Sequence, residues 1–372
     1  MNKIHLKVKE MLTLCQQVVG IIDAQQTMPI LAHVMIEAKG QTLKATSSDS
    51  QMQLEASIDL DEAVSDITFT VSGRKLFDIC KSLSPEAPLA ITTSDSQISF
   101  KSGKSHFRLS ALPAEEFPSF QSFSPSLTFQ IKESVLYTLF KKTSFAMAST
   151  DVRYYLNGLL LETNNHELVA VATDGHRLAI SRSPREEQFS HKIQSLMPRK
   201  TAIEMSKLLN KGSDAMVEVS LGTSTIAMTK PGLSMVSKLI DGRFPDYEQA
   251  IPQYRQKPTQ FNKDALKGAL QRTAILSNEK VGGIYLNIID QALKIFSKNP
   301  NLGDAEEVVP IEDGSMPSIR LGINAHYFLD VLNLIESQLV NVFFKDNDSS
   351  ILIESPDSDA EKSLYLIMPI CL

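Results

Sequence analysis

Asp174, His176 and Arg177 stand close together in the phrase TDGHR (173–177), and they are residue types that acid–base catalysis uses. The sequence around them offers no nucleophile, no glycine-rich phosphate loop and no cluster of carboxylates. An aspartate and a histidine two residues apart beside an apolar run more often belong to a turn whose polar groups are satisfied locally. We therefore expect a protein that is not an enzyme, with no catalytic residue, no cofactor and no metal site.

Lysines on predicted helices form a second group of candidate functional residues, because ammonium groups bind phosphate. Two predicted helices each carry several on one face: Lys200, Lys207 and Lys211 on the first, Lys263 and Lys267 on the second. The formal net charge of −6 argues against a protein that grips nucleic acid through a broadly basic surface. These lysines fit either an ordinary solvated helix face or a surface that meets phosphates weakly, without reading bases.

The composition indicates a soluble globular protein, with 42% hydrophobic and 22% charged residues in a chain of 372. Apolar runs such as 156–161 are too short to cross a bilayer, and the first ten residues lack the apolar core of a signal peptide. Cys15, Cys80 and Cys371 form no CxxC pair, which favours reduced thiols over disulfides or a zinc site. We expect a cytoplasmic protein.

The elements that carry these residues recur three times along the chain. Each repeat opens with a short strand that runs into an amphipathic helix: 4–19, 129–147 and 261–276. A second helix follows after about 60 to 70 residues of mostly alternating, β-rich sequence: 73–83, 198–211 and 324–336. The first two repeats close on related phrases, LPAEEFPSF (112–120) and IDGRFPDYEQA (240–250). The repeat predicts three α+β domains, each with two helices packed on β-sheets.

Polar stretches at 121–127 and 252–259 separate the repeats. They place the predicted domains at 1–124, 125–253 and 254–372, which is an ordinary domain size.

Five phrases in the last two repeats carry a family resemblance: DVRYYLNG (151–158), TDGHRLA (173–179), SKLIDGRFPDY (237–247), ILSNEK (275–280) and the terminal MPxxL (368–372). In these the chain resembles the bacterial sliding clamps, the beta subunits of DNA polymerase III. The resemblance implies a homodimeric ring, closed head to tail, with helices inside and sheets outside. Such a ring encircles duplex DNA without sequence preference, near the nucleoid. It tethers the clamp loader, polymerases and repair proteins through short linear peptides.

The resemblance also implies a groove for partner peptides between the second and third domains. Its expected residues are Leu156, Thr173, Gly175, His176, Arg177, Leu178, Pro245, Asn324, Tyr327, Ser350, Ile367, Met368, Pro369 and Leu372. A mostly apolar slot with a few polar hooks suits leucine or phenylalanine anchors. Gln249, Ala250 and Cys371 replace the arginine, valine and arginine of better-known members, which leaves peptide preference open.

For DNA contact, the resemblance points to Ser149, Arg153, Tyr154 and Tyr155, beside the lysines named above. Adjacent tyrosines are equally compatible with ordinary packing. Gln25 stands where many relatives have arginine, which predicts weaker contact with DNA at that position.

Ring closure would join the first domain of one protomer to the third domain of its mate. The implied residues are Lys75, Ile79, Lys104, His106, Phe107, Arg108 and Leu109 on one side, and Ile275, Leu276, Asp304, Glu306 and Glu307 on the other. A basic edge strand that meets an acidic turn is physically coherent. A strand that is charged only to prevent aggregation would leave Phe107 and Leu109 unexplained. His106 replaces a usual arginine, which predicts a weaker or pH-sensitive dimer.

Two alternatives stay open at this point. A metal-dependent nuclease would need clustered carboxylates, which the sequence does not offer. An acidic repeat scaffold that does not encircle DNA agrees with the sequence pI near 5.7.

Overall fold

The computed structural model describes residues 3–23, 28–94, 96–120, 122–186, 188–252, 258–277, 282–289, 291–314, 319–356 and 363–370. The chain divides into two compact units. The first unit comprises Met1–Leu136 and Ile203–Leu239, and the second comprises Tyr137–Ala202 and Ile240–Leu372. Each unit is described by itself below.

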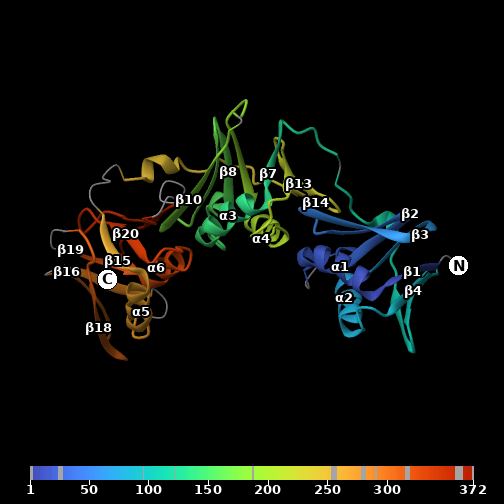
Figure 1. The fold of residues 1–372 in the computed structure, drawn as a ribbon, viewed down its shortest axis with the longest axis horizontal. Helices are drawn as coiled ribbons and strands as arrows, with labels where there is room; N and C mark the ends of the chain where they lie inside the picture. The colour runs from blue at the N-terminus through green and yellow to red at the C-terminus, as the bar shows by residue number, and fades with distance from the viewer. Residues whose placement is uncertain are drawn as a thin grey trace. The chain divides into compact units, whose positions relative to one another are not determined.

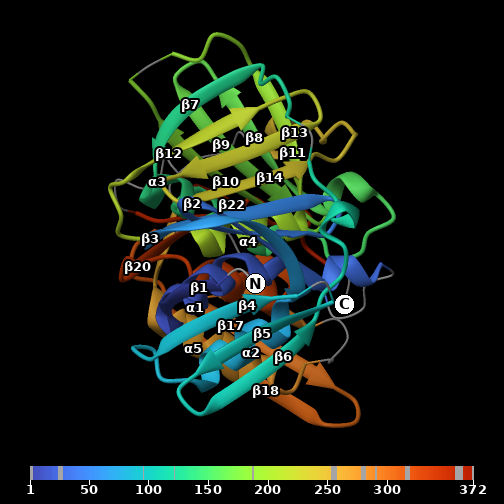
Figure 2. The same cartoon turned by 90° about the vertical axis from the view of Figure 1, so that its right-hand side faces the viewer.

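The first unit contains two sheets. The smaller has the strand order β1 (Lys3–Lys7), β4 (Pro88–Thr93), β5 (Gln97–Ser102) and β6 (Ser105–Ser110), and Figure 2 shows β4, β5 and β6 side by side. The larger has the order β2 (His33–Ser48), β3 (Met52–Ser72), β14 (Leu233–Lys238), β13 (Thr225–Lys230), β12 (Met216–Leu221) and β7 (Leu127–Lys132). The pairing of β3 with β14 therefore joins strands from two successive repeats in one sheet.

The second unit has the same plan. One sheet has the order β11 (Ile193–Pro198), β8 (Gly158–Asn164), β9 (Glu167–Thr173), β10 (Arg177–Pro184), β22 (Ser363–Ile367), β21 (Ile351–Glu354), β20 (Leu339–Phe343) and β15 (Thr259–Asn262). The other has the order β18 (Gly303–Pro310), β17 (Ala292–Asn299), β16 (Gly283–Ile289) and β19 (Ile319–Asn324). Here β10 pairs with β22, so strands of two repeats again share a sheet.

Among the residues that the structure describes, six α-helices occur in the predicted order, which confirms the α+β repeat. They are α1 (Val8–Val18), α2 (Gly73–Ser82), α3 (Glu133–Thr143), α4 (Arg199–Leu208), α5 (Lys263–Ala274) and α6 (Ala325–Leu332), as labelled in Figure 1. Short 3₁₀ helices follow or link them: η1 (Val19–Ile21), η2 (Pro29–Ala32), η3 (Ala114–Glu116), η4 (Ser144–Ala146), η5 (Tyr154–Leu156) and η6 (Tyr247–Ala250). The predicted helix 198–211 is too long, because α4 ends at Leu208 and leaves Lys211 beyond it.

The apolar spacing of α1 explains its packing. Met11, Leu14, Cys15 and Val18 recur three or four residues apart and are all buried, against α2, β2 and β3. At the amino end, the Glu10 carboxylate accepts a hydrogen bond of 2.6 Å from the Lys7 backbone N–H.

Two of the cysteines meet in this packing. Cys15 and Cys80 are buried free thiols, and a hydrogen bond with Cys80, together with burial, raises the pKa of Cys15. Cys371 lies outside the described residues.

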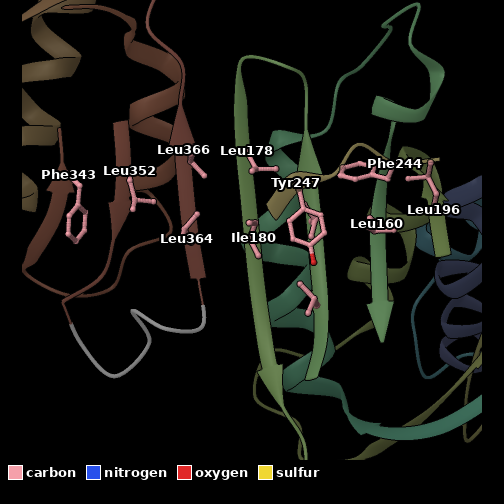
Figure 3. Packing of buried hydrophobic residues seen from close by; sticks show 12 residues of the cluster. Leu160, Leu178, Ile180, Leu196, Phe244, Tyr247, Phe343, Leu352, Leu364 and Leu366 are labelled. Atoms are coloured by element: carbon pink, nitrogen blue, oxygen red, sulfur yellow. The ribbon is translucent and has the colours of Figure 1, made fainter. Parts of the chain in front are cut away.

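A cluster of buried apolar side chains covers the sheet of the second unit where β10 pairs with β22. Leu160, Leu178, Ile180, Leu364 and Leu366 lie on one face of this sheet, on β8, β10 and β22 (Figure 3). Phe244 and Tyr247, from the phrase that closes the central repeat, complete this cluster. Buried leucine side chains on both strands thus hold β10 to β22.

Candidate functional site

A cleft of about 240 Å³ opens in the second unit where β10 meets β22. It is lined by Arg153, Tyr155, Leu156, Thr173, Gly175, Arg177, Leu178, Phe244, Pro245, Asp246, Tyr247, Ala250, Ser350, Leu366 and Met368. The floor is apolar and buried, whereas Met368 at the rim is 43% exposed. A slot of this kind suits large apolar side chains of a ligand.

The turn between β9 and β10 forms one wall of the cleft. Asp174 Oδ1 accepts hydrogen bonds from the backbone N–H groups of His176 (2.9 Å) and Arg177 (3.0 Å). Thr173 Oγ1 accepts from the Gly175 N–H at 3.0 Å, and Gly175 adopts a φ of +87°, which favours glycine. The Asp174 carboxylate is thus used to build the turn, so TDGHR is a structural motif here.

Arg177 ties this turn to its surroundings. Its Nε donates to Asp174 Oδ2 at 3.0 Å, Nη1 to Asp330 Oδ2 at 2.6 Å and Nη2 to the Phe145 carbonyl at 2.6 Å. The guanidinium also lies over the Tyr327 ring, 4.4 Å from its centroid. Because its side chain is only 13% exposed, these contacts hold the cleft wall in one position.

Arg153 lies against the same turn, with its Nη2 3.5 Å from the Asp174 carbonyl oxygen. Its Nε and Nη2 donate to the two carboxylate oxygens of Asp151, at 3.0 and 2.9 Å. This side-chain pairing, helped by a hydrogen bond from the Arg153 backbone, lowers the pKa of Asp151 to about 2. A Cβ atom at Gly175 would come within 2.8 Å of Arg153 Nη2, so glycine also makes room for this arginine.

The segment 244–250, which contains η6, forms another side of the cleft. The Tyr247 hydroxyl donates to Glu162 Oε1 at 3.0 Å, and Gln194 Nε2 donates to the other oxygen at 2.6 Å. Lys192 Nζ lies 3.2 Å from the same carboxylate. Burial, and then the neighbouring Glu162 charge, raise the pKa of Tyr247. This buried anchor fixes the aromatic side chain that lines the cleft.

Three family models match the chain in succession. The N-terminal domain of the DNA polymerase III beta subunit matches residues 2–121, the central domain 130–246 and the C-terminal domain 248–371. This chain belongs to the DNA polymerase III beta subunit family. It is therefore a DNA sliding clamp, a non-catalytic accessory subunit of a DNA polymerase.

Known clamps resemble it along their whole length. The beta sliding clamp of Pseudomonas putida is 40% identical over 360 residues, which cover 96% of either chain. The crystal structure of a Pseudomonas aeruginosa DNA polymerase sliding clamp with ligand matches with a TM-score of 0.94 and 39% identity over 100% of both chains. A second structure from that organism, bound to griselimycin, gives a TM-score of 0.93 and 38% identity, again over 100% of both chains. These matches do not favour the nuclease or the DNA-free scaffold.

Eight of the predicted groove residues line the cleft of the clamp: Leu156, Thr173, Gly175, Arg177, Leu178, Pro245, Ser350 and Met368. The others lie beside it or elsewhere. Tyr327 packs under Arg177, and the exposed His176 contributes its carbonyl oxygen, which accepts from the Met368 N–H at 2.8 Å. Ile367 is buried in β22, Asn324 caps α6 through the His326 N–H, and Pro369 is partly buried. Leu372 lies outside the described residues.

Sequence reasoning missed several lining residues of the cleft. Phe244, Asp246, Tyr247 and Leu366 were not predicted to line it, whereas Ala250, one of the positions that leave peptide preference open, does line it. The repeated closing phrase FP, at 117–118 and 244–245, was the signal available for the first of these. Arg153 and Tyr155, which were predicted to contact DNA, also line the cleft.

The remaining residues predicted for DNA contact are dispersed in the clamp. Ser149 and Tyr154 are exposed, and the Tyr154 ring stands edge-on to Tyr155. Lys207 is paired with Glu204 at 2.7 Å, and Lys263 donates to the Ile335 carbonyl at 3.2 Å. Lys200 and Lys267 are partly exposed on their helices, Lys211 is exposed, and Gln25 lies outside the described residues.

The predicted dimer residues lie on and near two edge strands, β6 of the first unit and β18 of the second. On β6, Phe107 and Leu109 stand directly opposite the buried Phe100 and Ile98, and they alternate with the exposed His106 and Arg108. Because they extend the apolar face of their own sheet, the two apolar residues have an explanation within the domain. A charged edge strand therefore no longer leaves Phe107 and Leu109 unexplained, and their place in a dimer contact stays a prediction.

The other predicted interface residues divide by exposure and pairing. Lys75 and Lys104 are exposed, while Ile79 and Leu276 are partly buried. Ile275 is 73% exposed just after α5, although it is a large apolar residue. On β18, Asp304 is exposed, Glu306 pairs with Lys294 at 3.1 Å, and Glu307 pairs with Arg272 at 2.7 and 2.9 Å.

The described residues contain no group of three or more histidine, cysteine, aspartate or glutamate side chains placed to hold a metal ion. Over the same residues, no helix is both long and apolar enough to pass through a membrane.

Proposed function

We propose that the cleft where β10 pairs with β22 binds short linear peptides of polymerases, the clamp loader and repair proteins. The β10–β22 pairing is called a seam below, and the cleft is called the peptide socket. The observation that carries this proposal is the combination of a buried leucine floor with a polar edge. Leu156, Leu178 and Leu366 form the floor, while Arg153 and Arg177 stand at the edge with their guanidinium groups already fixed. A preorganised edge costs little entropy when a peptide binds.

A matched pair of methionines tests this socket. Met368→Asp places a charge at the rim of the cleft, and Met216→Asp places the same charge at a methionine of β12 that is similarly exposed, 47% against 43%. The probe is a fluorescein-labelled pentapeptide with leucine and phenylalanine anchors, followed by fluorescence anisotropy. We expect Met368→Asp to weaken binding at least tenfold and Met216→Asp to leave it unchanged. Equal affinities for the two variants would refute the assignment.

Ring closure is supported by the two open strand edges. The exposed face of β6 is basic through Arg108 and His106, and β18 carries Asp304, Glu306 and Glu307. An edge strand presents unpaired backbone groups, so head-to-tail pairing of β6 with β18 of a second copy would satisfy both edges. The exposed Ile275 near the acidic side supplies apolar surface for the same contact.

In a closed ring, the contact between the clamp and DNA would be weak. The candidate residues are few, and Lys207 already has a carboxylate partner. Sparse phosphate contacts give low, salt-sensitive affinity, so enclosure rather than grip would hold the clamp on duplex DNA. We place this activity in the cytoplasm, at the nucleoid.

A further inference from the structure

A second cleft, of about 650 Å³, opens in the first unit where β3 meets β14. It is lined by Ser48, Ser50, Pro118, Ser119, Phe120, Ser122, Phe123, Ser224, Thr225, Lys238 and Leu239. No role described above uses these residues.

The turn at this second cleft repeats the turn at the first. Between β2 and β3 the sequence Ser48–Met52 has the pattern of Thr173–Arg177. Asp49 Oδ1 accepts from the N–H groups of Gln51 (2.9 Å) and Met52 (2.8 Å), as Asp174 does in the second unit. Ser48 Oγ accepts from the Ser50 N–H at 3.2 Å, and Ser50 has a φ of +71° where Gly175 has +87°.

The seams match as well. Lys238 N–H donates to the Gln51 carbonyl at 2.9 Å, as Met368 N–H donates to the His176 carbonyl at 2.8 Å. Strand register agrees, since Met52 faces Ser237 in one seam and Arg177 faces Ile367 in the other.

The segments that close the two clefts also correspond. Residues 117–120 (FPSF), with 122 and 123, correspond to the same positions of 244–250 (FPDYEQA), and both segments contribute their proline to the lining. Ser224, just before β13, corresponds to Ser350, just before β21. The second cleft is therefore the repeat-related counterpart of the peptide socket.

The chemistry of the two clefts differs at their rims. Lys238 replaces Met368, Ser119 replaces Asp246, and hydroxyl groups line much of the wall. None of the described residues that line this second cleft is acidic. Among the described residues, no carboxylate lies within ion-pairing distance of the exposed Lys238 ammonium, which stands 5.8 Å from the Phe120 ring centroid. An ammonium group and many hydroxyl donors favour a negatively charged ligand, while Phe120 and Phe123 offer it apolar surface.

We propose that the β3–β14 cleft is a second docking site, which takes a short acidic peptide whose carboxylate meets Lys238 and whose apolar side chain packs on the two phenylalanines. That the ligand is a peptide rests on the proposed function of the first cleft. The charge preference rests on residues of the second cleft alone.

The test measures binding of two labelled hexapeptides by fluorescence anisotropy. One alternates leucine with glutamate, and the other has glutamine in place of each glutamate. Both are titrated into full-length Met368→Asp protein, in which the aspartate repels the acidic peptide from the first cleft. Three further substitutions are then made in this Met368→Asp protein. Lys238→Met removes the ammonium and introduces the residue type found in the first cleft, whereas Lys238→Arg keeps the charge. Lys39→Met is the control, because it removes an exposed lysine that does not line the cleft.

We expect the glutamate peptide to bind about fivefold tighter than its glutamine analogue, the effect of one exposed ion pair. Lys238→Met should abolish that difference, whereas Lys238→Arg and Lys39→Met should keep it. Absence of binding to the Met368→Asp protein, or a preference that survives Lys238→Met, would overturn the proposal. The proposed function of the first cleft is tested separately. If it is wrong, the leucine–phenylalanine pentapeptide should bind the Met368→Asp protein as tightly as the unaltered protein.

Discussion

Replacing Arg177 by methionine is expected to loosen the seam between β10 and β22 and to weaken the peptide socket. The variant keeps an unbranched apolar side chain but loses the guanidinium, which leaves Asp174 Oδ2 and the Phe145 carbonyl without this donor. A hydrogen bond to a charged group contributes about 1.5–3 kcal/mol. The third partner, Asp330, is 43% exposed, so solvent screens that contact and we assign it less than about 1 kcal/mol. Because the contacts share one guanidinium, their contributions do not add fully, and the expected loss is about 2–4 kcal/mol of local stability.

Hydrogen exchange is the suitable assay, because a multidomain chain has no single well-defined free energy of unfolding. A loss of about 3 kcal/mol would speed exchange on β10 and β22 roughly 100-fold, wherever local opening limits exchange. The control is Arg182→Met on the same strand, whose Nε lies 3.5 Å from a partly exposed Glu167 carboxylate. That variant should change exchange by less than about fivefold. Equal acceleration in both variants would refute the view that Arg177 holds the seam.

Three further outcomes are expected. Tyr247→Phe leaves the buried Glu162 with one donor fewer, which should cost about 1–3 kcal/mol and speed hydrogen exchange on β8 at least about fivefold; unchanged exchange there would contradict this. NMR titration of Asp151 should give a pKa of about 2, and Arg153→Ala should return that pKa towards 3.8. The contact therefore stabilises the protein above about pH 4, and this stabilisation is lost as the pH falls towards 2. An Asp151 pKa that Arg153→Ala leaves unaltered would count against the pairing. If His106 meets the acidic strand of a second copy, the dimer should dissociate more readily at pH 8 than at pH 6, and identical dissociation constants would reject that contact.

The helices of this clamp could be predicted because their apolar residues recur at helical spacing. Met11, Leu14 and Val18 of α1 are all buried, as that spacing requires. The end of α4 was harder to predict, since the charged run to Lys211 continues the helical pattern past Leu208. Asn210 and Gly212 are helix-stop residues that could have marked it.

The joined sheets could not be predicted from the sequence. Alternation shows which face of a strand is buried, but it does not show the partner, and β3 pairs with β14 across more than 150 residues of chain. For the same reason the cleft residues Phe244 and Tyr247 escaped notice, although their phrase was recognised as a repeat. Arg153 and Tyr155 were expected to contact DNA from the family resemblance, and that contact stays a prediction. That they also line the cleft could not be predicted, because the sequence of a loop does not show which surface its side chains join.

Retention on circular DNA tests most directly whether enclosure holds this clamp in place. The protein is loaded onto a nicked circular plasmid by a clamp loader with ATP, isolated by gel filtration, and then challenged with a restriction enzyme that cuts the circle once. The clamp should stay with the intact circle and leave within the time of cutting, and bulky blocks at both DNA ends should restore retention. Loss from intact circles at the same rate as from cut DNA, or retention on cut DNA with open ends, would contradict the account.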